Sequence, residues 1–221
     1  MGQYHRLVNI SKKEFVSPHD LDDGAKLLEM INAQGGVMAA LNILLACSNG
    51  RGGGDLPDGT TYTGKPGKLR VLKDMSGLGV MPFFKVVADE KLYEMAEKYI
   101  GRWAGDQIAI IGDYAEDNDL DPKLPSASVL YGLCHEEKDV KDQIKEYEKD
   151  LKDAEPKKKA RLTERIALMK KMGPFTNISH DLRVLIEAAC NVVFGKDGRK
   201  KHPDGSLVEG PMFPDMVIRT K

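Results

Sequence analysis

The stretch from Glu136 to Met172, EEKDVKDQIKEYEKDLKDAEPKKKARLTERIALMKKM, differs in kind from the rest of this 221-residue chain and decides its architecture. Its first half places an apolar residue after intervals of four, three and four positions, at Val140, Ile144, Tyr147 and Leu151. That spacing is typical of a narrow apolar seam along an α-helix. Most other residues in this half are Lys, Glu and Asp, which favours a solvated outer face.

The second half of the stretch carries its own apolar stripe, at Leu162, Ile166, Met169 and Met172. Between the two stripes stands Pro156, which breaks a helix interior but is favoured at the first position of a helix. The pattern therefore predicts two antiparallel helices with a turn near 154–156.

Neither seam is wide enough to be stable alone in water, so the two helices must pack on each other, on the rest of the chain or on a second copy. We expect this hairpin to bind a protein partner or to form a homo-oligomer. The residues expected at that interface are those of the first seam, namely Val140, Ile144, Tyr147 and Leu151.

The remaining residues, 1–135 and 173–221, are expected to form one globular body. Alternating or β-branched runs predict strands at 4–10, 15–16, 70–72, 83–87, 107–111 and 217–218. Apolar periodicity predicts helices near 22–34, 37–47, 88–100 and 177–189, while 126–133 fits either a strand or a helix. The expected class is α+β, with a small mixed or antiparallel sheet packed by helices and the hairpin inserted at 136–172.

The charge balance argues against two classes of partner. The formal net charge is −1 with a pI near 6.5, and 30% of residues are charged. A general nucleic-acid or membrane-surface binder usually has a basic excess, so neither function is expected, and the basic cluster in 196–202 is expected to be solvated. No apolar run approaches the roughly 18–20 residues of a membrane span. The N-terminus lacks a secretory apolar region, so the expected location is a reducing cytoplasm.

The three cysteines are Cys47, Cys134 and Cys190. They are far apart and form no CxxC pair, so neither a disulfide framework nor a zinc site is expected. Cys47 and Cys190 lie in apolar runs and are expected to be small buried side chains. The neighbours Cys134 and His135 do not by themselves make a catalytic dyad, because a dyad requires spatial proximity.

A glycine-rich segment offers the first candidate ligand site. Asn49–Asp55 contains Arg51, Gly52, Gly53 and Gly54. Consecutive glycines let backbone N–H groups converge on an anion, and Arg51 would add positive charge. The segment follows an expected helix and lacks a closing Gly-Lys-Ser/Thr, so it is neither a Walker A loop nor a dinucleotide fingerprint. A surface loop and an anion-binding loop both remain open.

Two aspartates and a tryptophan flank the strand expected at 107–111. Asp106 and Asp113 could act as a base or bind a metal at the strand ends, or they could form turns. Seven residues of extended chain span roughly 23 Å, so the two cannot form one acid–base pair. Trp103, the only tryptophan, could pack in the core or stack on a ligand.

The acidic segment 113–121 resembles a calcium loop only in part. Asp117, Asp119 and Asp121 match the first, third and fifth positions of an EF-hand. The sixth position, normally Gly, is Pro122, and the twelfth, normally Glu, is Ser128, so the EF-hand interpretation fails. A solvated loop and a looser hard-cation site remain as alternatives, of which the solvated loop is expected, and no metal or cofactor is expected.

Several short motifs form a familiar set: Gly2-Gln3-Tyr4 with Val8-Asn9, Asp23-Gly24, Asn49–Asp55, and Trp103–Asp106 with Gly112–Tyr114. Together they resemble a family of uncharacterised bacterial and bacteriophage proteins. The resemblance covers residues up to about Glu116 and does not cover the hairpin. It implies a prokaryotic or phage origin and no particular activity or site residue.

The leading functional hypothesis is therefore a non-enzymatic binding or interaction protein, acting on a host factor or self-assembling through residues 136–172. The alternative is an enzyme or sequestering protein for a phosphorylated small molecule. In that alternative Arg51, Gly52, Gly53 and Gly54 would bind the anion, Trp103 would stack on the ligand, and Asp106 or Asp113 would supply a base or a metal ligand.

Overall fold

A four-stranded sheet lies at the centre of the described chain, which in this computed structural model comprises residues 3–32, 36–46, 94–95, 98–190, 193–194 and 200–201. In the order β3-β1-β2-β4, its strands are Ile108–Gly112, His5–Asn9, Glu14–Val16 and Thr176–Asn177. β1 pairs antiparallel with β2 and β3, whereas β2 pairs parallel with β4, so the sheet is mixed. A separate antiparallel pair joins β5 (Val193–Phe194) to β6 (Lys200–Lys201).

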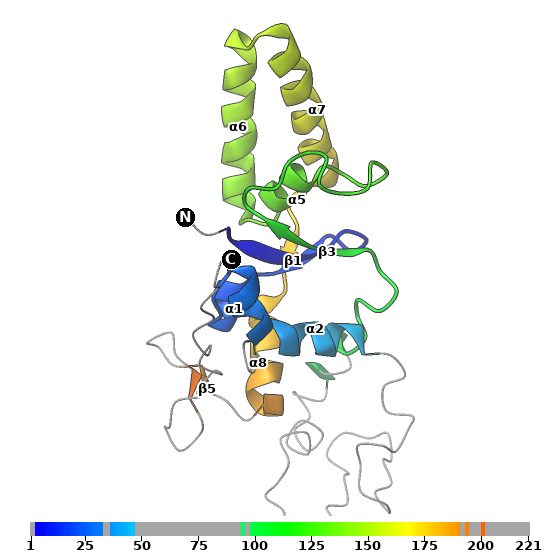
Figure 1. Cartoon of the computed structure of the whole chain (residues 1–221), viewed down its shortest axis with the longest axis vertical. Coiled ribbons are helices and arrows are strands. Elements are labelled where there is room, and N and C mark those ends of the chain that lie inside the picture. Colours follow the sequence, from blue (N-terminus) through cyan, green and yellow to red (C-terminus); the bar gives the residue numbers. More distant parts are fainter. Residues whose placement is uncertain are drawn as a thin grey trace, which may run out of the picture.

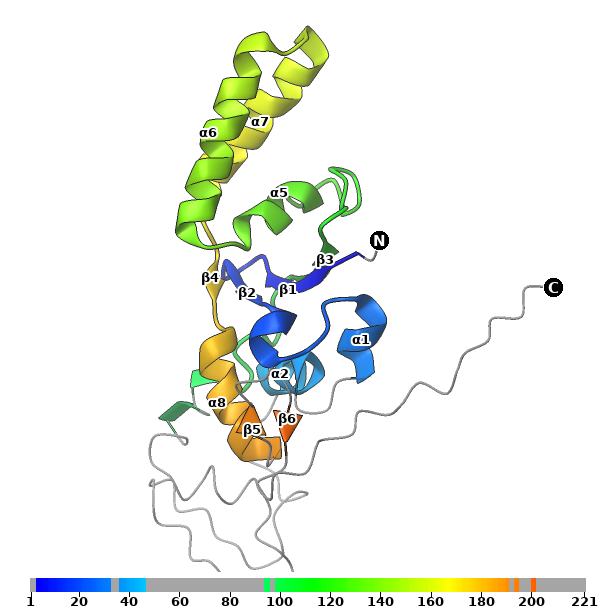
Figure 2. The same ribbon diagram turned by 90° about the vertical axis from the view of Figure 1, so that its left-hand side faces the viewer.

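Helices cover both faces of this sheet, which confirms the predicted α+β class (Figure 1 and Figure 2). One face is covered by η1 (Pro18–Leu21), α1 (Leu27–Asn32), α2 (Val37–Leu45) and α8 (Ser179–Cys190). The opposite face is covered by α5 (Ala127–Leu133) and by the bases of α6 (Glu137–Asp153) and α7 (Pro156–Met172).

The hairpin of β1 and β2 explains why the sheet has two apolar faces. Successive side chains of a strand point to opposite sides, so Leu7 enters one core and Val8 the other. The turn between the strands is closed by Asn9, whose Oδ1 accepts the backbone N–H of Lys12 at 2.8 Å. Lys13 completes the turn in the left-handed region with φ of 56°.

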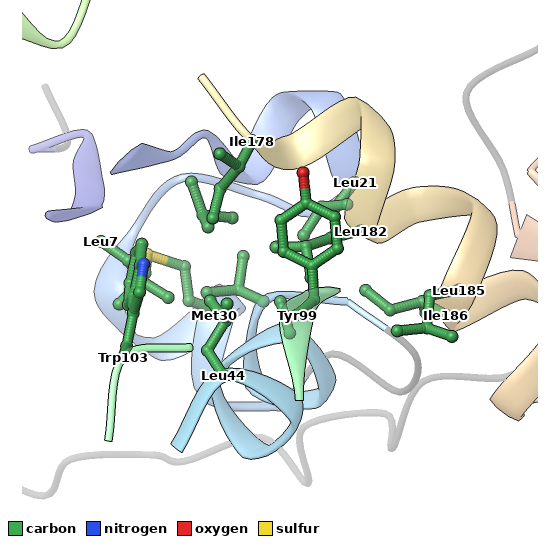
Figure 3. Packing of buried hydrophobic residues seen from close by; sticks show 13 residues of the cluster. Leu7, Leu21, Met30, Leu44, Tyr99, Trp103, Ile178, Leu182, Leu185 and Ile186 are labelled. Carbon is green, nitrogen blue, oxygen red and sulfur yellow. The ribbon is translucent and has the colours of Figure 1, made fainter. Parts of the chain in front are cut away.

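The first core lies between the sheet and α1, α2 and α8. Its largest side chains include Trp103, Tyr99 and Met30, all of them fully buried (Figure 3). The segment containing Trp103 is fixed to the end of α2, because the N–H of Trp103 donates to the carbonyl of Leu44 at 2.8 Å. The apolar run that forms α2 contributes Val37, Ala40 and Leu44 to this core.

The second core joins the other face of the sheet to α5, α6 and α7. α6 and α7 are 17 residues each and lie side by side in both views (Figure 1 and Figure 2). Only Ala154 and Glu155 separate them, and Pro156 begins α7, as predicted. We call these two helices, residues 137–172, the α6–α7 pair. α7 ends at Gly173, whose φ of 70° is readily adopted by glycine.

Sequence and structure differ in several short elements, and η1, β5 and β6 are among those that the sequence did not predict. The segment that fitted either a strand or a helix is helix α5, with Ser126 accepting the N–H of Val129 at its start. β4 was not predicted, since two residues carry no periodic pattern and it exists only through pairing with β2. The strands predicted at 70–72, 83–87 and 217–218 lie outside the described residues.

None of the helices in the described part of the chain combines the length and the apolar character that a bilayer crossing requires.

Candidate functional site

Trp103 lies in the first core, where it helps to hold a buried carboxylate. Glu14 of β2 points into this core and is 5% exposed. The indole Nε1 of Trp103 donates to Glu14 at 2.8 Å, and Nε of Arg102 lies 3.0 Å from both carboxylate oxygens. Burial raises the pKa of Glu14, but the hydrogen bonds from Arg102 and Trp103 outweigh it and hold the pKa below its ordinary value. The ring of Trp103 is thus unavailable to a ligand.

Asp106 connects the segment that contains Trp103 to the turn between β1 and β2. Its carboxylate accepts Nδ2 of Asn9 at 2.8 Å and forms an ion pair with Lys12 at 2.9 Å. The hydrogen bonds from Asn9 and Lys12 lower the pKa of Asp106. Gly105, with φ of 83°, gives the preceding turn a conformation that glycine readily adopts. These contacts therefore hold the Trp103–Asp106 segment against the turn between β1 and β2.

Asp113 lies at the other end of β3 and accepts the backbone N–H of Tyr4 at 3.0 Å. The register sets Ile108 opposite Asn9 and Gly112 opposite His5, so Asp106 and Asp113 sit at opposite ends of the strand. This agrees with the prediction that they cannot form one acid–base pair. The remaining residues of that predicted site, Arg51, Gly52, Gly53 and Gly54, lie outside the described residues.

The first seam of the α6–α7 pair packs within the molecule. Val140 is 1% exposed in the second core, and Ile144 and Tyr147 are half-buried against it. Leu151, near the far end of α6, is also half-buried. The facing side of α7 is buried at Leu162, Ile166 and Met169. Of the three arrangements that the sequence allowed, the structure shows packing of the helices on each other and on the body.

In the acidic segment 113–121, hydrogen bonds and ion pairs fix the side chain of Asp117. One carboxylate oxygen accepts Ser126 at 2.6 Å and Nη2 of Arg165 at 2.9 Å, and the other accepts Nε of Arg161 at 2.6 Å. Burial raises the pKa of Asp117, but hydrogen bonds from Ser126, Ser128 and the two arginines hold it well below its usual range. The other acidic side chains of the segment, Asp113, Glu116, Asp119 and Asp121, are exposed as expected for a solvated loop, whereas Asp117 is half-buried. Within the described ranges, no group of three or more His, Cys, Asp or Glu side chains could hold a metal ion.

The strongest candidate site surrounds Arg6 of β1. Its guanidinium lies over two aromatic rings, 5.4 Å from the centroid of Phe15 and 5.1 Å from that of Tyr131. Nη2 lies 3.4 Å from Nδ1 of His135, while Nη1 is buried without a hydrogen-bond partner. Among the described residues, no carboxylate forms an ion pair with Arg6. Arg6 as a whole is half-buried. A partly desolvated cation without a counter-charge is unusual, because removal of a charge from water is costly unless the charge is paired.

Arg6 lines a cavity of about 510 Å³, which we call the Arg6 pocket. Its walls come from the sheet and from both connections of the α6–α7 pair: His135–Asp139 leads into α6, and Pro174–Asn177 leads away from α7. The volume falls within the range of roughly 300–1,000 Å³ that is common for small-molecule sites.

The protonation states in the pocket favour recognition over nucleophilic chemistry. Burial raises the pKa of the Cys134 thiol to about 12, so this thiol is protonated at neutral pH and a poor nucleophile. Burial and the charge of Arg6 lower the pKa of His135, so its ring is neutral at pH 7. Since a guanidinium only donates hydrogen bonds, Nδ1 of His135 must be the acceptor.

Four carboxylates also line the pocket. Asp20 accepts Nδ2 of Asn177 at 2.7 Å, and Glu137 forms an ion pair with Lys141 one helical turn along α6. Glu136 and Asp139, both exposed, have neither a hydrogen-bonded side chain nor an ion pair in the described part of the chain. The pocket thus combines one unpaired cation with two unpaired anions.

Sequence reasoning missed this site. One signal was available: Arg6 shares a sheet face with the apolar Val8 and Ile10, so a charge interrupts the alternation of β1. The partners carried no signal, since His135 lies 129 residues from Arg6 along the chain.

Comparisons with protein-family models, with curated proteins and with solved structures found no match for this chain.

Proposed function

We propose that this chain is a binding protein and that its site is the Arg6 pocket, where it holds a small molecule through an anionic group. The observation that carries the proposal is the guanidinium of Arg6, which lines a cavity without a carboxylate partner in the described residues. An anionic ligand would supply the missing counter-charge.

The energetics support a ligand at this position. Each aromatic ring beside Arg6 offsets about 0.5–2 kcal/mol of its desolvation. A charge-assisted hydrogen bond to a ligand carboxylate would contribute a further ~1.5–3 kcal/mol, since such bonds are roughly twice as strong as neutral ones. Phe15 and Tyr131 hold the guanidinium in place before the ligand arrives, so less side-chain entropy is lost on binding.

Isothermal titration calorimetry of the full chain with butyrate and γ-aminobutyrate tests the proposal. Both probes carry a carboxylate, and we expect at least one to bind saturably. Arg6→Gln should abolish that binding, whereas the control Arg161→Gln, which changes an arginine outside the pocket, should leave it unchanged.

Arg6→Gln also removes the packing of the guanidinium on two rings, which could by itself disturb folding. A second variant therefore separates a loss of binding from a loss of folding. Arg6→Lys keeps the charge but loses the planar fork, and we expect it to fold and to bind more weakly. Absence of saturable binding to the wild-type chain at millimolar probe, or binding that survives Arg6→Gln, would contradict the proposal.

A second candidate function is self-association through the outer surface of the α6–α7 pair. The pair extends away from the sheet (Figure 1). Lys157, Lys159 and Lys171 of α7 are exposed and form no ion pair among the described residues, and the same holds for Glu146 and Asp153 of α6. A second copy could therefore set α7 of one molecule against α6 of another.

Sedimentation equilibrium over a range of protein and salt concentrations tests this second candidate. We expect a dimer that dissociates as salt rises, because exposed charges are screened. Lys157→Glu with Lys159→Glu and Lys171→Glu should prevent it, while Lys26→Glu, a change outside the α6–α7 pair, should not. A monomer at every concentration would eliminate this function and leave the pocket proposal intact.

A further inference from the structure

Strand β3 forms one edge of the four-stranded sheet, because among the described residues it pairs with β1 alone. The bonds that extend this pairing at its two ends show how the backbone of β3 is oriented. The N–H of Ile10 donates to the carbonyl of Gln107, and the N–H of Asp113 donates to that of Tyr4, each at 2.9 Å. Along an antiparallel strand, residues that bond to the neighbouring strand alternate with residues that face away from it. The odd-numbered residues of 107–113 therefore bond to β1, and the even-numbered residues face the open edge.

The open edge presents unpaired backbone groups beside apolar side chains. Ile108 and Ile110 direct their N–H and C=O groups outward, and no described residue pairs with them there. Their side chains are 38% and 46% exposed. Proteins usually protect a sheet edge with charged residues, proline or a bulge, but Ile108–Gly112 contains no charge and no proline and keeps an unbroken register with β1. Such an edge is a template for a further strand.

We propose that this edge binds a second copy of the chain, through antiparallel pairing of β3 with its counterpart. The two sheets would then join into one across a twofold axis, with each strand supplying the groups that the other lacks. The proposal concerns neither the Arg6 pocket nor the outer surface of the α6–α7 pair, so its test is independent of both.

The outward groups select a register for this pairing. Outward-facing residues must oppose outward-facing residues, so Ile108 of one copy pairs with Ile110 of the other, and Ala109 lies beside the twofold axis. Each such pair exchanges both backbone hydrogen bonds and sets two β-branched side chains opposite each other, which stabilises the strands. Pairing centred on Ile110 instead would need the carbonyl of Gly112, which already accepts the N–H of Ala115 at 3.1 Å.

The charges at the strand ends are compatible with self-pairing in this register. Asp106 would lie opposite Gly112 of the second copy. Asp113 would lie opposite Gly105, so no carboxylates face each other. A slip by one residue in one direction would set Asp106 against Asp113, and like charges directly opposite are destabilising. Asp106 is also neutralised by its ion pair with Lys12, and the formal net charge of −1 gives little long-range repulsion between two copies.

Sedimentation equilibrium of the full chain at about 0.5 M salt tests the proposal, because contacts between exposed charges are largely screened there. We expect a dimer with a Kd on the order of 100 µM, since pairing of one short strand buries a small area. Ile110→Lys should weaken this dimer about tenfold or more, because a charged side chain at a sheet edge opposes pairing. The matched control Val184→Lys changes a similarly exposed apolar side chain of α8 and should leave the Kd unchanged.

Amide hydrogen exchange of the unsubstituted chain tests the same proposal without depending on the folding of a variant. The amides of Ile108 and Ile110 should exchange quickly in dilute protein and become protected as the protein concentration rises. Those of Ala109 and Ile111 already bond to β1 and should be protected throughout. Only edge pairing predicts this alternation, because association through the face of a sheet or a helix would not distinguish neighbouring amides.

Three results would overturn the proposal. A monomer at every protein concentration up to about 1 mM in high salt would exclude the dimer. A dimer that is unaffected by Ile110→Lys would place the contact on another surface. Protection of Ile108 and Ile110 that does not change with protein concentration would show that the edge is covered within a single chain.

Discussion

At the scale of single residues, the most consequential group outside the pocket is the carboxylate of Glu14. It is buried in the first core and receives hydrogen bonds from Arg102 and Trp103. Removing one partner of such a group leaves the others desolvated and unpaired, which costs more than the net value of the bond itself. The motif around Trp103 thus serves stability in the described structure.

Glu14→Gln should lower the free energy of unfolding by about 2 kcal/mol at neutral pH, because the amide cannot neutralise Arg102. Urea denaturation measures this. The control Glu29→Gln, where the exposed pair with Lys26 is lost, should change stability by less than about 0.5 kcal/mol. Equal effects of the two substitutions would contradict the assigned role of Glu14.

The same carboxylate predicts a pH dependence with a defined sign. Folding lowers the pKa of Glu14, so the folded state releases this proton more readily than the unfolded chain. Its contribution is complete above the ordinary carboxylate pKa and is lost as pH falls through the lowered value. The stability difference between wild type and Glu14→Gln should therefore shrink on acidification. A difference that stays constant down to pH 3 would argue against an ionised Glu14 in the core.

At the scale of elements, the α6–α7 pair is held by packing at its base. Met169 is 1% exposed and lies in the second core with Val140. Met169→Ala should cost about 2–4 kcal/mol in the free energy of unfolding, through lost contacts and the cavity left behind. Thermal and urea unfolding measure it. The neighbouring Lys170→Ala removes only an exposed ion pair with Glu148 and should cost less than about 0.5 kcal/mol. Similar losses for both would show that the base does not pack as described.

The elements with strong local patterns were predictable from sequence. The heptad spacing and Pro156 predicted both helices and the position of their turn. β1, β2 and β3 followed from short β-prone runs. α5 was ambiguous because a short apolar run fits a strand or a helix equally well, and its position between the sheet and α7 decides the outcome. The sequence could not show whether the first seam packs on α7, on the body or on a second copy, since an apolar seam does not identify the surface that covers it.

At the scale of the whole molecule, the Arg6 pocket depends on contacts that no local pattern reveals. β1, β2, the start of α6 and the residues after α7 meet there although they are far apart in the chain. Each of the strand-end aspartates, by contrast, is used in a nearby backbone or side-chain contact. Spacing alone excluded a joint site for Asp106 and Asp113, but only the tertiary fold could place an unpaired arginine beside unpaired carboxylates.

The central claim is that the Arg6 pocket is a ligand site, and a ¹H–¹⁵N chemical-shift map of the full chain titrated with γ-aminobutyrate tests it most directly. We expect the backbone amides of His135, Asp139, Thr176 and Asn177 to shift along one saturating curve, because these residues line the cavity from both connections of the α6–α7 pair. Shifts that do not saturate, or that centre on 103–113 or on the outer end of the α6–α7 pair instead, would contradict the claim.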